Sequence, residues 1–213
     1  MQNIILLAPP AAGKGTLANY LCEKFGYVSI STGDLLREEA KKNKELEKLM
    51  HSGKLIDDNI VFELLKAKLN KLGNTPYILD GFPRTESQAV MYGELIQNMS
   101  KKLGVVIYLD VDKNELKTRV TTRLICPNCK ATYSIREKRL APKKDFVCDK
   151  CESKLIQRED DKEEIFDKRY EEYLTSTSPL IDYYDSKGVL VKISDTDMSL
   201  VFEKVSSLVN NND

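Results

Sequence analysis

The 213-residue chain has little charge imbalance, little histidine and no long apolar run. Lysine plus arginine number 33 and aspartate plus glutamate number 33, which disfavours a general nucleic-acid binder, because such proteins normally carry a basic excess. The single histidine, His51, lies in a charged helical stretch away from every motif, which excludes a histidine-based triad. No apolar run approaches the length of a membrane span and no charged leader precedes one, so we expect a soluble, cytoplasmic protein.

Four of the five cysteines form two C-x₂-C pairs separated by 18 residues: Cys126, Cys129, Cys148 and Cys151. Four thiolates at this spacing suit a tetrahedral Zn²⁺ site, and disulfides are the weaker interpretation in a protein without a secretion signal. Four cysteine ligands leave no coordination position open for water, so we expect a structural zinc in a short β-ribbon over about residues 125–156. Cys22, on the apolar side of the first helix, is most simply a small buried residue.

The chain begins with a candidate phosphate-binding loop. Residues 4–7 predict a buried strand, residues 8–12 a turn of small residues, and residues 17–25 a helix that follows Gly13-Lys14-Gly15-Thr16. In such a loop, backbone N–H groups and the helix dipole face an anion, and the lysine reaches the outer phosphates. The match is imperfect, because Ala8 stands at the first glycine position and Thr16 lies one place later than the strict pattern requires.

Short apolar segments alternate with helical segments along the rest of the chain. We expect further strands near residues 28–30, 77–79, 105–110 and 189–193, and helices near 57–72, 87–98, 114–124, 160–185 and 199–209. This alternation predicts βαβ units, and therefore an α/β fold with a five-stranded parallel sheet flanked by helices. The length allows one core and a small insertion, and it is too short for two full domains.

Two more motifs follow predicted strands. Ser31-Thr32-Gly33-Asp34 opens a helix that carries Arg37, and Asp80-Gly81-Phe82-Pro83-Arg84 follows the strand at 77–79. Ligands of parallel sheets bind beyond the carboxyl ends of the strands, where these motifs and the glycine-lysine loop all lie. Asp80 is in position to hold Mg²⁺, directly or through water.

Arginines are concentrated near these motifs and near the cysteine segment: Arg37, Arg84, Arg119, Arg123, Arg158 and Arg169. Their planar donors suit phosphate, and phosphoryl transfer requires mainly positioning and charge neutralisation. Several arginines together with one loop lysine are what a phosphotransferase that binds two nucleotides needs.

Taken together, these motifs resemble those of the adenylate kinase family, in the long bacterial form that has a zinc-bearing lid. The resemblance covers essentially the whole chain in order, and it includes Gln88 and Gln157-Arg158-Glu159-Asp160-Asp161. It implies a P-loop nucleoside-monophosphate kinase fold and reversible phosphoryl transfer from Mg-ATP to AMP, giving two ADP. It also implies a monomer whose partners are ATP, AMP and ADP, with no nucleic acid and no membrane.

The resemblance assigns roles to individual residues. It implies that ATP is bound by Ala11, Ala12, Gly13, Lys14, Gly15, Thr16, Arg119, Arg123, Thr132, Tyr133 and Asp197. It implies that AMP is bound by Thr32, Arg37, Lys54, Leu55, Ile56, Gly81, Phe82, Pro83, Arg84, Gln88, Arg158 and Arg169. The catalytic group is expected to be Lys14, Arg84, Arg123, Arg158 and Arg169, with Zn²⁺ structural in the lid and Mg²⁺ accompanying ATP.

Three moving parts are expected from the same resemblance. These are a core (residues 1–30, 61–121 and 162–213), a helical insertion that binds the nucleoside monophosphate (31–60) and a zinc-binding lid (122–161). Closure of the lid would exclude water, so that AMP and not water accepts the phosphoryl group.

The sequence departs from the family pattern at three positions. Ala8 and Ala11 replace glycines of the loop, and a positive φ at either would strain the backbone by about 1 kcal/mol or more. Leu124 replaces a second arginine beside Arg123, which removes one charge near the lid hinge. We expect an active enzyme with weakened ATP affinity.

Three other functions compete with this interpretation. The first is a kinase that acts on UMP or CMP or uses GTP as donor, although Thr32 and Gln88 occupy adenine-reading positions. The second is a nucleotide sensor without turnover, which the retained Lys14, Asp80 and arginines disfavour. The third is a zinc-ribbon nucleic-acid module, which the balanced charge disfavours.

Overall fold

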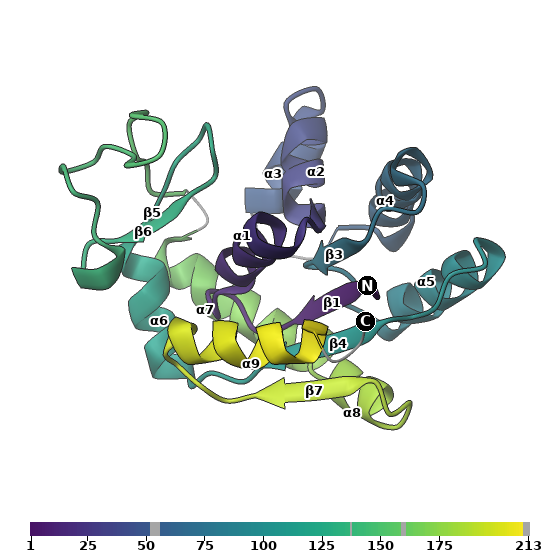
Figure 1. The fold of residues 1–213 in the computed structure, drawn as a ribbon. Coiled ribbons are helices and arrows are strands. Elements are labelled where there is room, and N and C mark those ends of the chain that lie inside the picture. The colour runs from purple at the N-terminus through teal and green to yellow at the C-terminus, as the bar shows by residue number, and fades with distance from the viewer. Residues whose placement is uncertain (52–55, 137, 159–160, 211–213) are drawn as a thin grey trace.

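The computed structural model describes residues 1–51, 56–136, 138–158 and 161–210. Strands and helices alternate along these residues (Figure 1). The strands are β1 (Ile4–Leu7), β2 (Val28–Ser31), β3 (Tyr77–Asp80), β4 (Val105–Leu109), β5 (Arg123–Ile125), β6 (Thr132–Ser134) and β7 (Leu190–Ile193). The helices are α1 (Lys14–Phe25), α2 (Thr32–Ala40), α3 (Lys44–His51), α4 (Asp58–Leu72), α5 (Glu86–Asn98), α6 (Lys113–Thr122), α7 (Glu163–Glu172), α8 (Leu180–Asp185) and α9 (Met198–Asn210), with single helical turns η1 (Lys138–Leu140) and η3 (Tyr173–Thr177).

The main sheet has five strands in the order β2-β3-β1-β4-β7, and every pairing is parallel. The predicted five-stranded parallel sheet is therefore confirmed. β1 lies at its centre, with Ile5 opposite Leu79 of β3 and opposite Val106 of β4. The two outer strands are both reached by crossover connections, which brings the carboxyl ends of all five strands to one edge.

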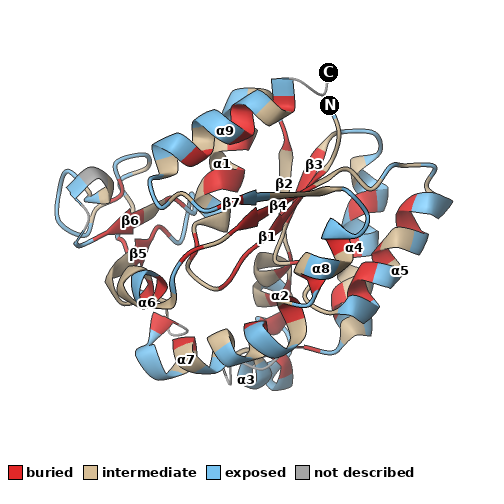
Figure 2. Cartoon of the chain, turned by 90° about the horizontal axis from the view of Figure 1, so that it is seen from below, coloured by how far each residue is buried: buried red, intermediate tan, exposed pale blue. Residues whose placement is uncertain are grey.

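Helices cover both faces of the sheet, and the side chains of β1 alternate between the two layers. Ile5 and Leu7 pack into a core shared with α2, α4, α5 and α8, whereas Ile4 and Leu6 pack into a core shared with α1, α6 and α9. Both faces of the central strands are buried, as Figure 2 shows. This double burial explains why the central strands read as continuous apolar runs in the sequence.

The segment expected as one helix over residues 114–124 ends earlier than predicted. α6 stops at Thr122, and Arg123 and Leu124 lie on strand β5. The hydroxyls of Thr121 and Thr122 donate to the carbonyls of Lys117 and Thr118 at 3.0 and 2.9 Å. Such bonds compete with the regular helix, and Arg123 follows in extended conformation with ψ 134°.

The long helix expected over residues 160–185 is interrupted. α7 passes into the π-helical turn η3, and α8 begins only after Pro179. Proline has no N–H for the helical ladder, and the hydroxyl of Ser178 donates to the carbonyl of Leu174 at 2.8 Å, so the backbone widens before the proline. Thr177, in this turn, lies against the segment that follows β3, where its hydroxyl donates to the carbonyl of Arg84 at 2.9 Å.

Beyond α6 the chain forms a small separate unit around β5 and β6, which pair antiparallel (Figure 1). Its apolar cluster contains Leu124, Ala131, Tyr133 and Leu155 together with the cysteines. A bridge between Ile125 and Ile156 closes the unit where the chain returns to the core. Among the described residues, no helix combines the length and apolar character needed to cross a membrane.

Candidate functional site

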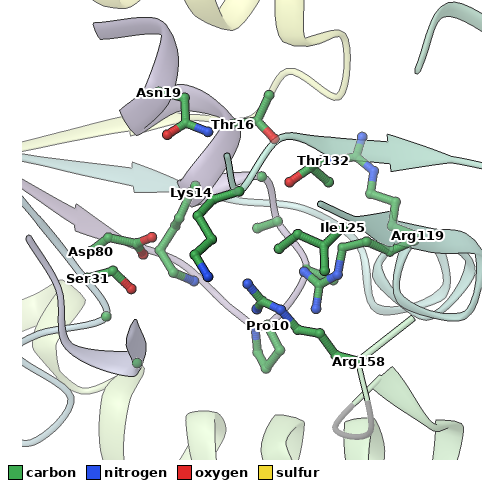
Figure 3. Close-up of a pocket in the computed structure, with 18 of the residues that line it drawn as sticks. Pro10, Lys14, Thr16, Asn19, Ser31, Asp80, Arg119, Ile125, Thr132 and Arg158 are labelled. Carbon is green, nitrogen blue, oxygen red and sulfur yellow. The ribbon is translucent and has the colours of Figure 1, made fainter. Parts of the chain in front are cut away.

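A cleft opens at the carboxyl ends of the strands, between the sheet and the β5–β6 unit. Segments far apart in sequence line it, including the β1–α1 loop, the start of α2, the end of β3, α6 and the β5–β6 unit (Figure 3). Predicted site residues that line it are Ala11, Ala12, Gly13, Lys14, Gly15, Thr16, Arg37, Asp80, Gly81, Arg84, Arg119, Arg123, Thr132, Tyr133, Arg158 and Arg169. The structure thus brings most of the sequence-derived candidates into one cleft.

The β1–α1 loop ends in a helix start suited to an anion. α1 begins at Lys14, earlier than expected, and its N-cap Gly13 has a φ of 98° and no side chain to cap the helix. The first N–H groups of α1 therefore face the cleft with the positive end of the helix dipole. A side chain on Gly13 would be strained at this φ and would come within 3.0 Å of Met198.

Only one of the two loop alanines adopts the conformation that favours glycine. Ala11 has a φ of 65°, in the left-handed region, and it lines the cleft. Ala8 is not among the described residues with positive φ, and it is 7% exposed within the core under α1. The backbone strain that the sequence raised for both positions is therefore present at Ala11 and not at Ala8.

Lys14 is held inside the loop by backbone carbonyls. Its Nζ donates to the carbonyl oxygens of Ala8 at 2.8 Å and Pro9 at 3.0 Å. Burial lowers the pKa of Lys14 to about 8, although the charge of Asp80 acts in the opposite direction. Nearby Arg84 and Arg169 lower the pKa further, which marks a strongly cationic site with Lys14 at its centre.

The end of β3 is shaped by Gly81. Its carbonyl accepts from Thr32 Oγ1 and from Arg84 Nε, both at 2.8 Å. Gly81 has a φ of 81°, and a Cβ there would lie 3.1 Å from Arg84 Nη2 and 3.2 Å from Thr32 Oγ1. Glycine is thus required for the approach that aims the Arg84 guanidinium into the cleft.

Arg37 is oriented by a neighbour on its own helix. Asp34 Oδ1 accepts from Arg37 Nη2 at 2.7 Å and from Nε at 3.2 Å, and the Asp34 N–H donates to the Ser31 side chain that caps α2. Burial raises the pKa of Asp34, but the hydrogen bond and charge of Arg37 outweigh it and hold the pKa below its usual value. The pair presents Arg37 beside the N-terminus of α2.

On the opposite wall, two arginines are anchored by backbone and carboxylate groups. Arg119 donates to Glu115 and, through Nη2, to the carbonyl of Thr196 at 2.8 Å, which places it beside Asp197. Arg123 donates through Nε to Asp161 Oδ2 at 2.9 Å and through Nη2 to the other carboxylate oxygen. Figure 3 shows Arg158 and Lys14 entering the same cleft from different segments.

Several predicted AMP-site residues lie behind the cleft wall. Phe82, Thr32, Gln88 and Ile56 are buried, at 0%, 2%, 2% and 8% exposure, and Pro83 lines a smaller neighbouring cavity. The polar atoms of Gln88 have partners within the protein, because Oε1 accepts from the N–H of Arg84 at 2.8 Å and Nε2 donates to Asp58 Oδ1 at 2.6 Å. Lys54 and Leu55 lie outside the described residues.

The four cysteines of the β5–β6 unit converge on one point. All four Sγ atoms lie within 4.8 Å of one another, with Cys126 and Cys151 3.4 Å apart and Cys129 and Cys148 3.5 Å apart. A tetrahedral Zn–S site has Zn–S distances of about 2.3 Å, and sulfurs at these separations fit it. Hydrogen bonds from the side chain and backbone of Ser153 lower the pKa of Cys151 to about 5, which favours the thiolate that binds metal.

Tyr133 lies between the cysteine cluster and the cleft. Its hydroxyl lies 3.4 Å from Cys148 Sγ and accepts from the N–H of Asp149 at 2.8 Å, while the residue also lines the cleft. The cysteine cluster and the cleft wall are therefore connected through one buried side chain.

Several cleft residues were not predicted from the sequence. Lys130 lines the cleft from the turn after Cys129, with a φ of 63°, and Thr196 lines it through the loop after β7. Asp34 was expected only to favour the helix start, yet it orients Arg37. Two sequence features could have indicated them. Lys130 directly follows the first cysteine pair, and Asp34 directly follows Gly33.

Comparison with known proteins identifies relatives along nearly the whole chain. Residues 6–189 match the family model described as adenylate kinase. The chain is 42% identical to an adenylate kinase of Archaeoglobus fulgidus over 214 aligned residues, covering 98% of each chain. It is 41% identical to one of Thermotoga petrophila over 202 residues (92% of this chain and 91% of the other) and 44% identical to one of Caldicellulosiruptor bescii over 195 residues (89% and 90%).

Proposed function

The chain belongs to the adenylate kinase family, and from that premise we propose how its residues carry out the family's reaction. The protein is an enzyme that transfers a phosphoryl group reversibly from ATP to AMP, giving two ADP. The observation that carries the assignment of roles is the single cleft in which the loop lysine, the N-terminus of α1 and arginines from several segments converge.

ATP occupies the side of the cleft formed by the β1–α1 loop and the β5–β6 unit. The backbone of Ala11 to Thr16 and the Lys14 ammonium hold its phosphates, and Thr132, Tyr133 and Arg123 complete the wall. Arg119 lies along the adenine, whose edge meets the backbone near Asp197. The hydrogen bond from Arg119 to the carbonyl of Thr196 supports this placement, because it fixes the guanidinium beside that loop.

AMP occupies the side formed by α2 and the end of β3. Arg37 and Arg84 hold its phosphate together with Arg158 and Arg169, and all four arginines line the cleft. Thr32, residues 54–56, Gly81 to Pro83 and Gln88 surround the nucleoside. Gln88 reads the adenine. Gln88 is 2% exposed, so its amide must become accessible when AMP binds.

The transfer step needs no protein nucleophile. An oxygen of the AMP phosphate attacks the γ-phosphorus of ATP, the bond from that phosphorus to the β,γ-bridging oxygen breaks, and the bridging oxygen leaves on ADP. Lys14, Arg84, Arg123, Arg158 and Arg169 neutralise the charge on the transferring group, which is where this reaction gains most of its acceleration.

Two metal ions accompany this assignment. Mg²⁺ would supply charge neutralisation on the ATP phosphates, and Asp80 would hold it through water from the end of β3, where the residue lines the cleft. Zn²⁺ occupies the Cys126, Cys129, Cys148 and Cys151 cluster, where it stabilises the lid.

The chain divides into a core (1–30, 61–121 and 162–213), a monophosphate-binding insertion (31–60) and a lid (122–161). The separate apolar cluster of the β5–β6 unit supports the lid as a body of its own. Closure of the lid on ATP excludes water from the transferring group. The enzyme works as a monomer in the cytoplasm.

The assignment is tested by measuring ADP formation from Mg-ATP with AMP, UMP, CMP and GMP in parallel. Turnover with AMP alone is expected, whereas preference for UMP or CMP, or for GTP as donor, would replace the substrate assignment. Binding of both nucleotides without turnover would identify a nucleotide sensor instead.

The residue roles need variants of their own. Arg158→Lys and Arg169→Lys are each expected to lower kcat by roughly 10²–10³-fold with little change in Tm, because a point charge replaces a fork of donors. Lys113→Gln is the matched control, since Lys113 pairs with Asp167 and Glu171 on the outer surface of α6 and α7. Unchanged kcat in both arginine variants would overturn the assignment.

A further inference from the structure

A closed set of hydrogen bonds surrounds the Gln88 side chain. Gln88 Oε1 accepts from the N–H of Arg84, and Gln88 Nε2 donates to Asp58 Oδ1. The second oxygen of Asp58 accepts from Thr85 Oγ1 at 2.9 Å, and Thr85 Oγ1 in turn accepts from the N–H of Gln88 at 3.1 Å. Asp58, the first residue of α4, is thus joined to the first turn of α5 through both carboxylate oxygens.

These contacts fix which end of the Gln88 amide is oxygen and which is nitrogen. An ionised carboxylate only accepts hydrogen bonds, and a backbone N–H only donates. A half-turn of the amide would place Oε1 against the carboxylate of Asp58 and the NH₂ group against the N–H of Arg84. Both contacts would be repulsive, so the observed orientation is held from two sides.

The orientation matters because adenine and guanine present opposite patterns on their Watson–Crick edges. Adenine offers an amino donor and a ring-nitrogen acceptor, whereas guanine offers a carbonyl acceptor and a ring N–H donor. An amide has two N–H donors and two acceptor lone pairs, so Gln88 keeps one of each after its bonds to Asp58 and Arg84. An amide held in one orientation therefore complements adenine, and the same amide after a half-turn complements guanine.

We propose that Asp58 is a positioning residue that holds the Gln88 amide in one orientation and thereby makes the enzyme select adenine over guanine in the phosphoryl acceptor. This inference rests on the proposed function, in which Gln88 reads the base of AMP. Asp58 itself touches no substrate, and it acts through the carboxylate that excludes the flipped amide.

Helix capping alone does not account for this arrangement. Thr85 and Gln88 have the spacing of a capping box, in which the fourth residue reaches back to the N-cap backbone. Glutamate serves that purpose as well as glutamine, and neither needs a carboxylate from another helix. With glutamate at position 88, however, Asp58 would face a second carboxylate at hydrogen-bond distance. The donor end of the amide is what Asp58 engages.

The experiment compares kcat/KM for AMP and GMP, at saturating Mg-ATP, in the full-length enzyme and in Asp58→Asn. The asparagine keeps the shape of Asp58 and can donate to a flipped Gln88, so of the two contacts that oppose the flip only the one with the N–H of Arg84 remains. We expect the ratio of kcat/KM for AMP to that for GMP to fall at least about tenfold, through KM for AMP, because hydrogen-bonded readout carries large discrimination. The KM for ATP should remain within about twofold of the wild-type value, since the ATP side is unaltered.

Asp57→Asn is the matched control, because Asp57 is the neighbouring carboxylate and its Oδ1 accepts from the N–H of Asn59 at the start of α4. Its AMP-to-GMP ratio should equal that of the wild type. In the double variant Asp58→Asn with Gln88→Glu, the amide at position 58 donates to the carboxylate at position 88. Its Tm should therefore return to the wild-type value, but its AMP-to-GMP ratio should not. Recovery of both would reduce Asp58 to a structural role and overturn the proposal.

Gln88→Ala separates this inference from the assignment on which it rests. If Gln88→Ala leaves the AMP-to-GMP ratio unchanged, the base-reading role of Gln88 fails and the proposal fails with it. If Gln88→Ala lowers the ratio while Asp58→Asn leaves it within about twofold of the wild-type value, only the role of Asp58 is wrong.

Discussion

Arg123 and Asp161 form a bidentate ion pair that joins β5 to the segment that leads into α7. Arg123 Nε and Nη2 each donate to a different oxygen of Asp161, whose side chain is 1% exposed. The two residues are 38 positions apart, at the points where the chain enters and leaves the β5–β6 unit. This geometry fixes the plane of the guanidinium that we assign to the transferring phosphoryl group.

We therefore expect Asp161→Asn to impair transfer more than binding. The amide offers one acceptor oxygen in place of two, so the guanidinium loses its fixed plane, and misplacement of a catalytic group costs on the order of 100-fold in rate. Steady-state kinetics should show a fall in kcat with KM for AMP little changed. Asp167→Asn is the control, because Asp167 pairs with lysines on the outer surface. Equal kcat in the two variants would contradict the assignment.

The lowered pKa of Lys14 predicts a pH dependence on the alkaline side. The free enzyme loses the Lys14 proton as the pH rises through about 8, well below the usual value of 10.5. ATP binds best to the protonated ammonium, so kcat/KM for ATP should fall above pH 8, and binding of ATP above that pH should take up a proton. The uptake can be measured by titration calorimetry in buffers with different ionisation enthalpies.

Lys14→Arg tests whether the Lys14 ammonium is the group that titrates. A guanidinium stays protonated throughout this range, so the variant should have lower activity and no decline in kcat/KM between pH 8 and 10. A decline that persists in Lys14→Arg would assign the titration to another group.

Ala11 and Ala8 should respond differently to glycine. Ala11 has a φ of 65°, so Ala11→Gly removes left-handed strain of roughly 1–2 kcal/mol, part of which is offset by the greater backbone freedom of glycine in the unfolded chain. Ala8 has no such strain and packs in the core, so Ala8→Gly should only destabilise. Urea unfolding and the KM for ATP of both single variants measure the difference. A lower KM for ATP in Ala8→Gly than in Ala11→Gly would contradict this explanation.

Features carried by short contiguous motifs were predictable from the sequence. The strand at residues 4–7, the loop lysine and the Asp80–Arg84 segment were each located because apolar runs define strands and the following residues must lie at the sheet edge. The arrangement that the structure adds depends on partners distant in sequence. Asp58 and Gln88 are 30 residues apart, and no local pattern indicates that their side chains meet.

Local ambiguity explains the remaining errors. Arg123 and Leu124 were assigned to a helix because the preceding residues have helical composition, yet two threonine hydroxyls compete for the carbonyls of the last turn. The break at η3 depends on Pro179, whose effect extends back over the preceding turn. The sequence did identify the alanines as unusual, but only the backbone geometry shows that Ala11 alone carries the strain.

Removal of the Zn²⁺ that we propose for the four-cysteine cluster should destabilise the β5–β6 unit. The cysteine cluster includes Cys126 and Cys148, both 0% exposed, within an apolar cluster too small to stabilise the unit alone. Chelation with a strong zinc chelator, or Cys151→Ser, should lower Tm and raise the KM for ATP. Cys22→Ser is the control, because Cys22 lies on α1 outside the cluster. Unchanged Tm and unchanged hydrogen exchange in residues 122–158 after chelation would show that the cluster stabilises the β5–β6 unit without metal.

Leu124 gives a further test, because it stands where the resemblance to the family implies a second arginine. The sequence interpretation treated Leu124 as the loss of one charge, but Leu124 is 3% exposed and packs with Ala131, Tyr133 and Leu155 in the apolar cluster of the β5–β6 unit. Leu124→Arg would therefore place a charge among apolar side chains and not add one to the cleft. We expect hydrogen exchange over β5 and β6 to accelerate and kcat to fall, whereas Leu124→Met, of similar volume, should keep both near wild type. A gain in kcat for Leu124→Arg would mean that the arginine side chain reaches the cleft past Arg123, and that the lid core does not need Leu124.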